Sequence, residues 1–203
     1  MNRFVLAIDL GREVDPTTFA LVDDAGATLD VLLLDRFRPV REDMSDVIGR
    51  ALEVAEHPRV AGQVEVLFDA CGVGRDWSRL VRGSRLARVP LFGIIPVGNS
   101  RSPGQGRGGT VFVPKVALAG ALHRAGTSGR VRFAKGLRYV EELRRELEAY
   151  TRKASPISGV TTYANDRRSD HDDLVSAVAM ALWWTQDRAG RGVNKFRPLQ
   201  EVA

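Results

Sequence analysis

The sequence predicts a mixed α/β fold in a single domain, and three observations indicate it. The first 37 residues hold three strand-like segments in a row, which is typical of an antiparallel meander. Strand-like and helix-like segments then alternate, as in β-α-β units that add parallel strands to a sheet. Finally, the segment Ser169–Trp184 is apolar on every side of the helical wheel, so this helix should be buried against that sheet.

The individual elements follow from hydrophobic periodicity and turn residues. The strands of the meander are expected at residues 3–9, 17–23 and 28–37. Further strands are expected at residues 63–69, 91–97, 111–113, 130–133 and 160–163. Helices are expected at residues 43–56, 75–83, 114–124, 136–153 and 169–184, so that helices flank the sheet. Residues 1–190 should form the domain, and residues 191–203 a basic, flexible tail.

Composition limits the function classes. The chain has 203 residues, of which 44% are hydrophobic, and no apolar run long enough to span a bilayer, so no membrane partner is expected. Its start does not resemble a signal peptide. The single cysteine, Cys71, excludes an internal disulfide and a cysteine-based zinc site, and a reducing, cytoplasmic setting is expected. The net charge of +5 favours a polyanionic partner such as double-stranded DNA.

Acidic residues stand at three places where the predicted fold brings chain ends together. Asp9 and Asp69 each end a strand, and these strands are expected to be parallel neighbours, so both carboxylates should emerge at one sheet edge. Asp170, Asp172 and Asp173 lie on the first turn of the buried C-terminal helix, which should face the same edge. Each aspartate taken alone is also an ordinary turn or helix-capping residue.

Carboxylates that converge in this way repel one another and stay ionised together only if a cation neutralises them. With oxygen ligands alone, the expected ion is Mg²⁺ or Mn²⁺. Such a site beside a basic surface suits phosphodiester cleavage with two metal ions.

A Gly/Ser/Arg-rich segment, residues 98–109, is expected to be a mobile loop whose Arg101 and Arg107 reach DNA phosphates. The alternative is a solvated hairpin tip. Because no helix-turn-helix or zinc-finger pattern is present, contacts should be mostly to the DNA backbone, with little base readout.

Three segments in order carry a family resemblance: Ala-Ile-Asp9-Leu-Gly, Phe-Asp69-Ala-Cys-Gly72-Val-Gly74 and His171-Asp172-Asp173-Leu-Val-Ser-Ala. Together they resemble the nuclease domain of phage terminase large subunits, which has the ribonuclease H-like fold. The resemblance extends over essentially the whole chain, including Val113-Pro114-Lys115 at a helix start and the segment Glu141–Glu146. It implies a metal-dependent endonuclease that cuts concatemeric viral DNA during packaging.

Carried over by position, the resemblance gives Asp9, Asp69 and Asp173 as metal ligands and catalytic residues for two divalent ions. Asp172 is the alternative or an additional ligand. Asp15 is a further candidate carboxylate, for which Glu13 competes.

Other residues of these motifs have more than one reading. His171 is a candidate catalytic residue that orients water, contacts the scissile phosphate or binds metal, and equally a neutral helix-start residue. Asp170 is better explained as a helix cap. Gly72 and Gly74 allow a tight turn and a close approach of DNA, although packing alone also demands glycine there. Lys115 joins Arg101 and Arg107 as a candidate DNA contact.

The sequence also departs from complete terminase large subunits, because it contains no Gly-x-x-x-x-Gly-Lys-Ser/Thr loop. The chain is therefore either a nuclease domain cut from a longer protein or a separately encoded nuclease, and an ATPase motor domain or subunit is expected as a partner. The family resemblance also implies a small terminase subunit and a portal as partners, and the host cell cytoplasm as the setting if the chain is phage-encoded. The alternatives are a resolvase-like nuclease of the same fold, a non-catalytic DNA-binding or assembly module, and an actin-like nucleotide-binding fold, which needs a longer chain.

Overall fold

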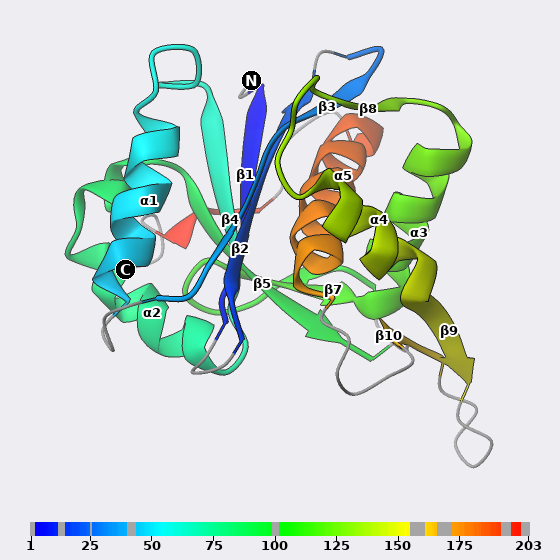
Figure 1. Ribbon diagram of the computed structural model, residues 1–203. Helices are drawn as coiled ribbons and strands as arrows, with labels where there is room; N and C mark the ends of the chain where they lie inside the picture. Colours follow the sequence, from blue (N-terminus) through cyan, green and yellow to red (C-terminus); the bar gives the residue numbers. More distant parts are fainter. Residues whose placement is uncertain are drawn as a thin grey trace.

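The structure, a computed structural model, describes residues 3–11, 15–24, 26–39, 44–98, 102–154, 161–165, 172–191 and 196–199. Most described strands belong to one central sheet: β1 (Phe4–Asp9), β2 (Thr17–Asp24), β3 (Leu29–Phe37), β4 (Val64–Asp69), β5 (Leu91–Val97), β6 (Gly104–Gln105), β7 (Thr110–Pro114) and β8 (Val131–Phe133). Within the described ranges their order across the sheet is β6-β7-β5-β4-β1-β2-β3-β8. The sheet forms the centre of the molecule (Figure 1).

The strand directions match the expected topology. β1, β2 and β3 pair antiparallel as a meander. β4 lies parallel to β1, β5 parallel to β4, and β7 parallel to β5, as β-α-β units require. The predicted mixed sheet is therefore confirmed, including the edge strand β8, which pairs parallel with β3.

Helices cover both faces of this sheet (Figure 1). The described helices are α1 (Ser45–Ala55), α2 (Val73–Arg82), the 3₁₀ helix η1 (Arg85–Arg88), α3 (Lys115–Thr127), α4 (Val140–Ala149) and α5 (Asp173–Arg191). Alternate residues of β1 point to opposite faces, so Phe4, Leu6 and Ile8 join a core with α1 and α2. Val5 and Ala7 join a second core with α3, α4 and α5.

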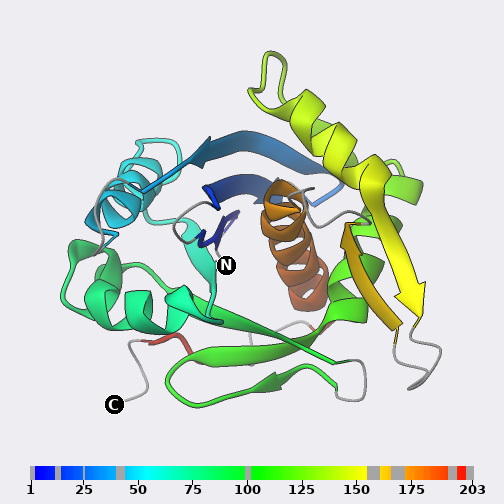
Figure 2. The same cartoon turned by 60° about the horizontal axis from the view of Figure 1, so that its bottom comes forward.

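The helix α5 is buried as its apolar sequence predicted. It packs against β1, β2 and α3, and Figure 2 shows it between the curved sheet and α3. Its Trp184 packs against the ring of Phe92 at a centroid distance of 4.5 Å and donates a hydrogen bond from Nε1 to Oε2 of buried Glu65 at 2.6 Å. These contacts fix α5 along its length, and therefore fix the position of its first turn.

One helix prediction was wrong at both ends. The helix expected over residues 136–153 is α4, which begins only after Gly136 and Tyr139, both in a left-handed backbone conformation. It stops at Ala149, and Tyr150–Ala154 forms a strand, β9, that pairs antiparallel with β10 (Thr161–Asn165). The strand expected at 160–163 therefore belongs to a separate two-stranded sheet. β-Branched and aromatic residues in both segments favour this pairing over helix.

Two further expectations differ from the structure. Residues Gly104–Gln105 of the expected loop form the short strand β6, which pairs with β7. In the expected flexible tail, residues 196–199 are packed: Phe196 stacks on Trp184 with ring centroids 5.6 Å apart, and Leu199 is buried against β6 and β7. Apolar side chains in this basic segment explain the difference. Among the described residues, no helix is long and apolar enough to cross a membrane.

Candidate metal and catalytic site

The site is built on a row of residues that crosses four strands at one sheet edge. In the parallel pair β1 and β4, Ile8 lies opposite Phe68, so Asp9 and Asp69 come next, side by side. Thr18 of β2 pairs with Asp9 in the antiparallel ladder, and Arg36 of β3 pairs with Thr18. The first turn of α5 lies at this same end of the sheet (Figure 1).

The position of Arg36 in this row depends on a β-bulge. Val22 pairs with Val31 but Leu21 pairs with Leu33, so Leu32 is an extra residue in β3. Without it, Asp35 would stand opposite Thr18. Asp35 instead accepts a hydrogen bond from Arg50 of α1 at 2.7 Å, which leaves the cationic Arg36 for the acidic end of α5.

Three contacts join the start of α5 to this row. The hydroxyl of Thr18 donates to the carbonyl oxygen of Asp173 at 2.9 Å. Ser176, one turn into the helix, makes a side-chain hydrogen bond to Asp9. Arg36 donates from Nη2 to Oδ2 of Asp173 at 3.3 Å. Asp173 and its neighbour Asp172 are thereby held over the strand-end aspartates.

The pKa of Asp9 is raised, which indicates that the other carboxylates lie close to it. Burial raises the pKa of Asp9 well above its ordinary value, and the negative charges of Asp69, Asp173 and Asp172 raise it further. The hydrogen bond from Ser176 offsets a small part of this shift in the pKa. Four carboxylates therefore act on one another here, and the protein's own groups do not neutralise the Asp9 charge.

Glu146 of α4 makes hydrogen bonds to the first turn of α5. Its Oε2 accepts hydrogen bonds from the backbone N–H groups of Leu174 and Val175, at 3.0 and 3.2 Å. Its Oε1 accepts from Nη1 of Arg36 at 3.4 Å. Because a helix start leaves its first N–H groups without intrahelical partners, this buried carboxylate serves as a remote cap for α5.

The pKa of Glu146 leads to a prediction for stability. Burial raises this pKa from 4.5 to about 7, so the folded protein binds a proton that the unfolded chain releases. The resulting stabilisation is complete below the unfolded pKa and is lost as the pH rises through about 7. Urea unfolding in EDTA should show the Glu146→Gln variant gaining up to about 3 kcal/mol relative to the parent protein between about pH 5 and about pH 8. A difference that does not change with pH would contradict this assignment.

The turn after β4 fixes Asp69. Its Oδ1 accepts a hydrogen bond from the backbone N–H of Cys71 at 2.7 Å. Gly74 packs so tightly that an added Cβ would lie 1.7 Å from the carbonyl oxygen of Asp69, and Gly72 has a φ of 50°. Both glycines are thus explained by the turn itself. Burial and the charge of Asp69 raise the pKa of the Cys71 thiol to about 12, so the thiol is protonated at neutral pH.

The remaining predicted residues lie at different distances from this group. Asp15 sits on an exposed bend two residues before β2, and its carbonyl packs on Gly11; its role as a further carboxylate stays a prediction. Lys115 is close enough for its charge to lower the Cys71 pKa, which places it beside the Asp69 turn. Arg107 lines a cleft next to that turn. His171, Asp170, Arg101 and Glu13 lie outside the described residues.

Sequence reasoning missed Thr18, Arg36, Ser176 and the capping role of Glu146. Ser176 carried a usable signal, because it follows Asp172 and Asp173 by four and three residues and so shares their helix face. Glu146 was included only in the segment that carried the family resemblance. Nothing in the local sequence marks Thr18 or Arg36.

The donor set fits a hard divalent cation, since it consists of carboxylate oxygens whose mutual repulsion is not relieved. In the described part of the chain, however, no three His, Cys, Asp or Glu side chains are already grouped tightly enough to hold an ion. Asp173 is paired with Arg36 instead. Metal binding would therefore use the second oxygen of the Asp173 carboxylate, Oδ1, or displace Arg36 from Oδ2.

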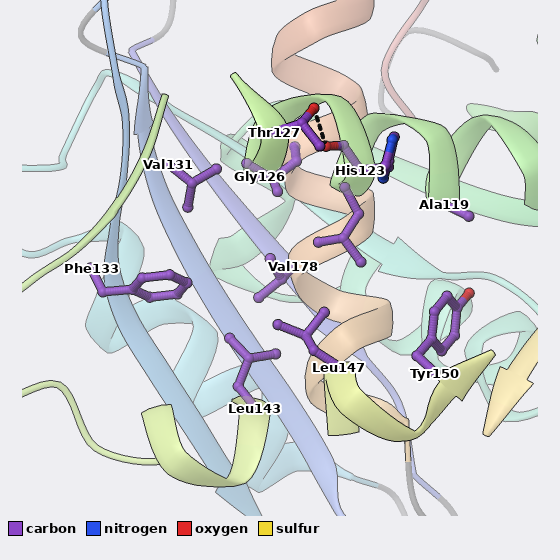
Figure 3. Close-up of a pocket in the computed structure, with 12 residues that line it drawn as sticks. Ala119, His123, Gly126, Thr127, Val131, Phe133, Leu143, Leu147, Tyr150 and Val178 are labelled. Carbon is purple, nitrogen blue, oxygen red and sulfur yellow. Dashed lines mark hydrogen bonds between the residues drawn. The ribbon is translucent and has the colours of Figure 1, made fainter. Parts of the chain in front are cut away.

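A second cavity, of about 590 Å³, has a different chemistry. It lies between α3, β8, α4 and α5 and is lined mainly by apolar side chains, including Phe133, Leu143 and Val178 (Figure 3). Thr127 and Tyr150 bring hydroxyl groups to the lining, and that of Thr127 donates within α3 to the carbonyl oxygen of His123 at 2.9 Å. With no carboxylate in its lining, this cavity does not suit metal-dependent hydrolysis.

The chain has the ribonuclease H-like fold that terminase nuclease domains have. Sequence comparison matches the chain to no protein-family model and to no curated protein. Structural comparison gives clear matches. The large terminase nuclease of thermophilic phage G20c with bound magnesium has a TM-score of 0.60 at 17% identity, covering 89% of this chain and 80% of that one.

Two other viral proteins are similar over most of the chain. The manganese-soaked terminase nuclease domain of human cytomegalovirus has a TM-score of 0.60 at 14% identity, covering 97% of this chain and 88% of that one. The large terminase of a second thermophilic bacteriophage has a TM-score of 0.61 at 11% identity, covering 92% of this chain but 39% of that longer protein. The resemblance that the three motifs predicted is therefore confirmed at the level of the fold.

Proposed function

We propose that the chain is a divalent-metal-dependent endonuclease that cuts concatemeric phage DNA during genome packaging. One observation carries the proposal: Asp9, Asp69, Asp172 and Asp173 converge at the ends of β1 and β4 and the start of α5, where their charges raise the pKa of Asp9. Structural neighbours that are terminase nuclease domains, some with magnesium or soaked with manganese, support it.

In this proposal, Asp9, Asp69 and Asp173 hold two Mg²⁺ or Mn²⁺ ions, with Asp172 as an alternative or additional ligand. The ions would supply an activated water and stabilisation of the leaving oxygen. Thr18 and Ser176 position the α5 carboxylates and Asp9 through the hydrogen bonds described above. His171 and Asp15 remain predictions, the first as a group that orients water and the second as a further carboxylate.

The proposed nuclease function also implies a substrate and partners. Double-stranded DNA is the expected substrate, with Arg101, Arg107 and Lys115 as backbone contacts. An ATPase motor domain or subunit is an expected partner, because the sequence holds no phosphate-binding ATPase loop. A small terminase subunit and a portal are expected from the resemblance to terminase large subunits. The host cell cytoplasm is the expected setting.

Incubation of supercoiled plasmid with the purified chain tests this function. Nicked and linear products should appear with Mn²⁺ or Mg²⁺ and disappear with EDTA, because the carboxylates alone supply no nucleophile. Cleavage without divalent metal would contradict the proposal. A strong preference for four-way junctions over linear duplex would favour the resolvase-like alternative, and DNA binding without cleavage under any divalent ion would favour a non-catalytic module.

A further inference from the structure

A cleft of about 770 Å³ begins directly beside the turn that carries Asp69. One end is lined by residues 70–72 of that turn, and one wall is formed by α2. The opposite wall is the connection between β6 and β7, with Gln105, Gly106 and Gly108. Phe112 and Leu199 add apolar surface. The cleft therefore adjoins the loop that carries one of the proposed metal ligands.

The charge of the cleft has one sign. Its lining includes the arginines Arg75, Arg82 and Arg107, and no aspartate or glutamate. Arg75, Ser78 and Arg82 form one stripe along α2, at spacings of three and seven residues. At 1.5 Å per residue the two arginines are about 10 Å apart along the helix axis. That is about three base-pair steps, since each strand of the duplex carries one phosphate per about 3.4 Å of helix axis.

Within the part of the chain that the structure describes, these guanidinium groups differ from their neighbours in having no acidic partner. Among the described residues, none of Arg75, Arg82 and Arg107 forms an ion pair, whereas Arg79 pairs with Asp76 at 3.4 Å on the solvent side of α2. Arg82 is directed across the cleft, since its Nη2 lies 3.2 Å from where a Cβ on Gly108 would be. Uncompensated arginines facing one another across a cleft are suited to bind a polyanion.

We propose that this cleft, defined by Arg75, Arg82 and Arg107, binds the phosphate backbone of the DNA strand that leads away from the carboxylate site. The inference rests on the proposed function for its direction, because the DNA must have its scissile phosphate at Asp9 and Asp69. Its binding is independent of sequence, since the guanidinium groups contact phosphates rather than base edges. It adds Arg75 and Arg82 to the DNA contacts expected from the sequence.

The test is DNA binding without cleavage, measured in EDTA by fluorescence anisotropy of a labelled linear duplex between about 50 and about 200 mM salt. Each lost phosphate contact lowers the slope of log K against log salt by about 0.9. The Arg75→Gln/Arg82→Gln variant should therefore lose about 1.8 from the slope and bind about 10- to 60-fold more weakly at about 0.1 M salt. Each single variant should reduce the slope by about 0.9, half of the reduction expected for the double variant.

A matched control removes the same charge elsewhere. Arg79→Gln/Arg85→Gln replaces two exposed arginines paired with Asp76 and Glu56, and should leave the slope unchanged. Arg75→Lys/Arg82→Lys should keep the parent slope. An unchanged slope in Arg75→Gln/Arg82→Gln, or an equal loss in the control, would overturn the cleft assignment even if the parent protein cleaves DNA. Conversely, a selective loss upholds the cleft even if no cleavage is found.

Discussion

Replacing Asp69 with asparagine should reduce metal-dependent DNA cleavage by more than about 100-fold while the protein stays folded. Loss of a group that merely orients a metal ligand costs about 10- to 100-fold, and loss of a charged ligand should cost more. Asparagine keeps an oxygen that accepts the hydrogen bond from the N–H of Cys71, so the turn is preserved and only the negative charge is removed. The rate of plasmid nicking in saturating Mn²⁺ measures the effect.

Asp76→Asn is the matched control, because it removes one negative charge from an exposed position on α2, seven residues away. Its cleavage rate should stay within about twofold of the parent rate, as expected for a surface substitution of less than about 0.5 kcal/mol. Full activity of Asp69→Asn would remove Asp69 from the site. An equal loss in both variants would indicate a general effect of charge.

Replacing Glu146 with alanine should destabilise the metal-free protein by about 2–4 kcal/mol. The substitution leaves the buried N–H groups of Leu174 and Val175 without their acceptor. It also leaves Arg36 with Asp173 as its remaining partner among the contacts described for it. The change in the free energy of unfolding can be measured by urea denaturation in EDTA, at constant pH.

Glu148→Ala provides the comparison on the same helix. Its carboxylate is exposed and pairs with Arg144 one turn earlier, so the cost should be below about 0.5 kcal/mol. If Glu146→Ala is no more destabilising than Glu148→Ala, Glu146 does not cap α5. The Glu146 variant should also cleave DNA more slowly, since the capped turn is the one that presents Asp172 and Asp173.

The strand-end carboxylates were predictable because their positions follow from rules that depend little on detail. An aspartate that ends a strand lies at an edge of the sheet, and the carboxyl ends of parallel neighbours meet at the same edge. Asp9 and Asp69 satisfy this rule twice, and β1 and β4 are parallel neighbours as expected. The buried character of α5 was equally clear from its sequence, and it brings Asp173 to the same edge.

The groups around these carboxylates were not predictable, because they depend on register. Arg36 reaches Asp173 only because the bulge at Leu32 shifts β3 by one residue relative to β2. A one-residue shift reverses which side chains of β3 face α5. No turn residue or strand propensity in this hairpin predicts the bulge. The Glu146 cap likewise depends on how α4 packs against α5, which tertiary contacts decide.

The boundary between α4 and β9 shows the limit of periodicity as a signal. Leu143 and Leu147 follow a helical spacing that continues to Tyr150, so the pattern predicted one long helix. The chain leaves the helix at Tyr150 because residues 150–154 pair with Thr161–Asn165, a partner that local sequence does not reveal. The C-terminal segment was predicted to be flexible because it is basic, although two of its apolar side chains, Phe196 and Leu199, are buried.

The central claim is that Asp9, Asp69 and Asp173 bind divalent metal. Anomalous diffraction from crystals soaked in Mn²⁺ tests it most directly. Two manganese peaks are expected between the ends of β1 and β4 and the first turn of α5, with Asp173 among the ligands. Both peaks should be lost in crystals of Asp69→Asn. Ordered carboxylates with no manganese between them would contradict the claim.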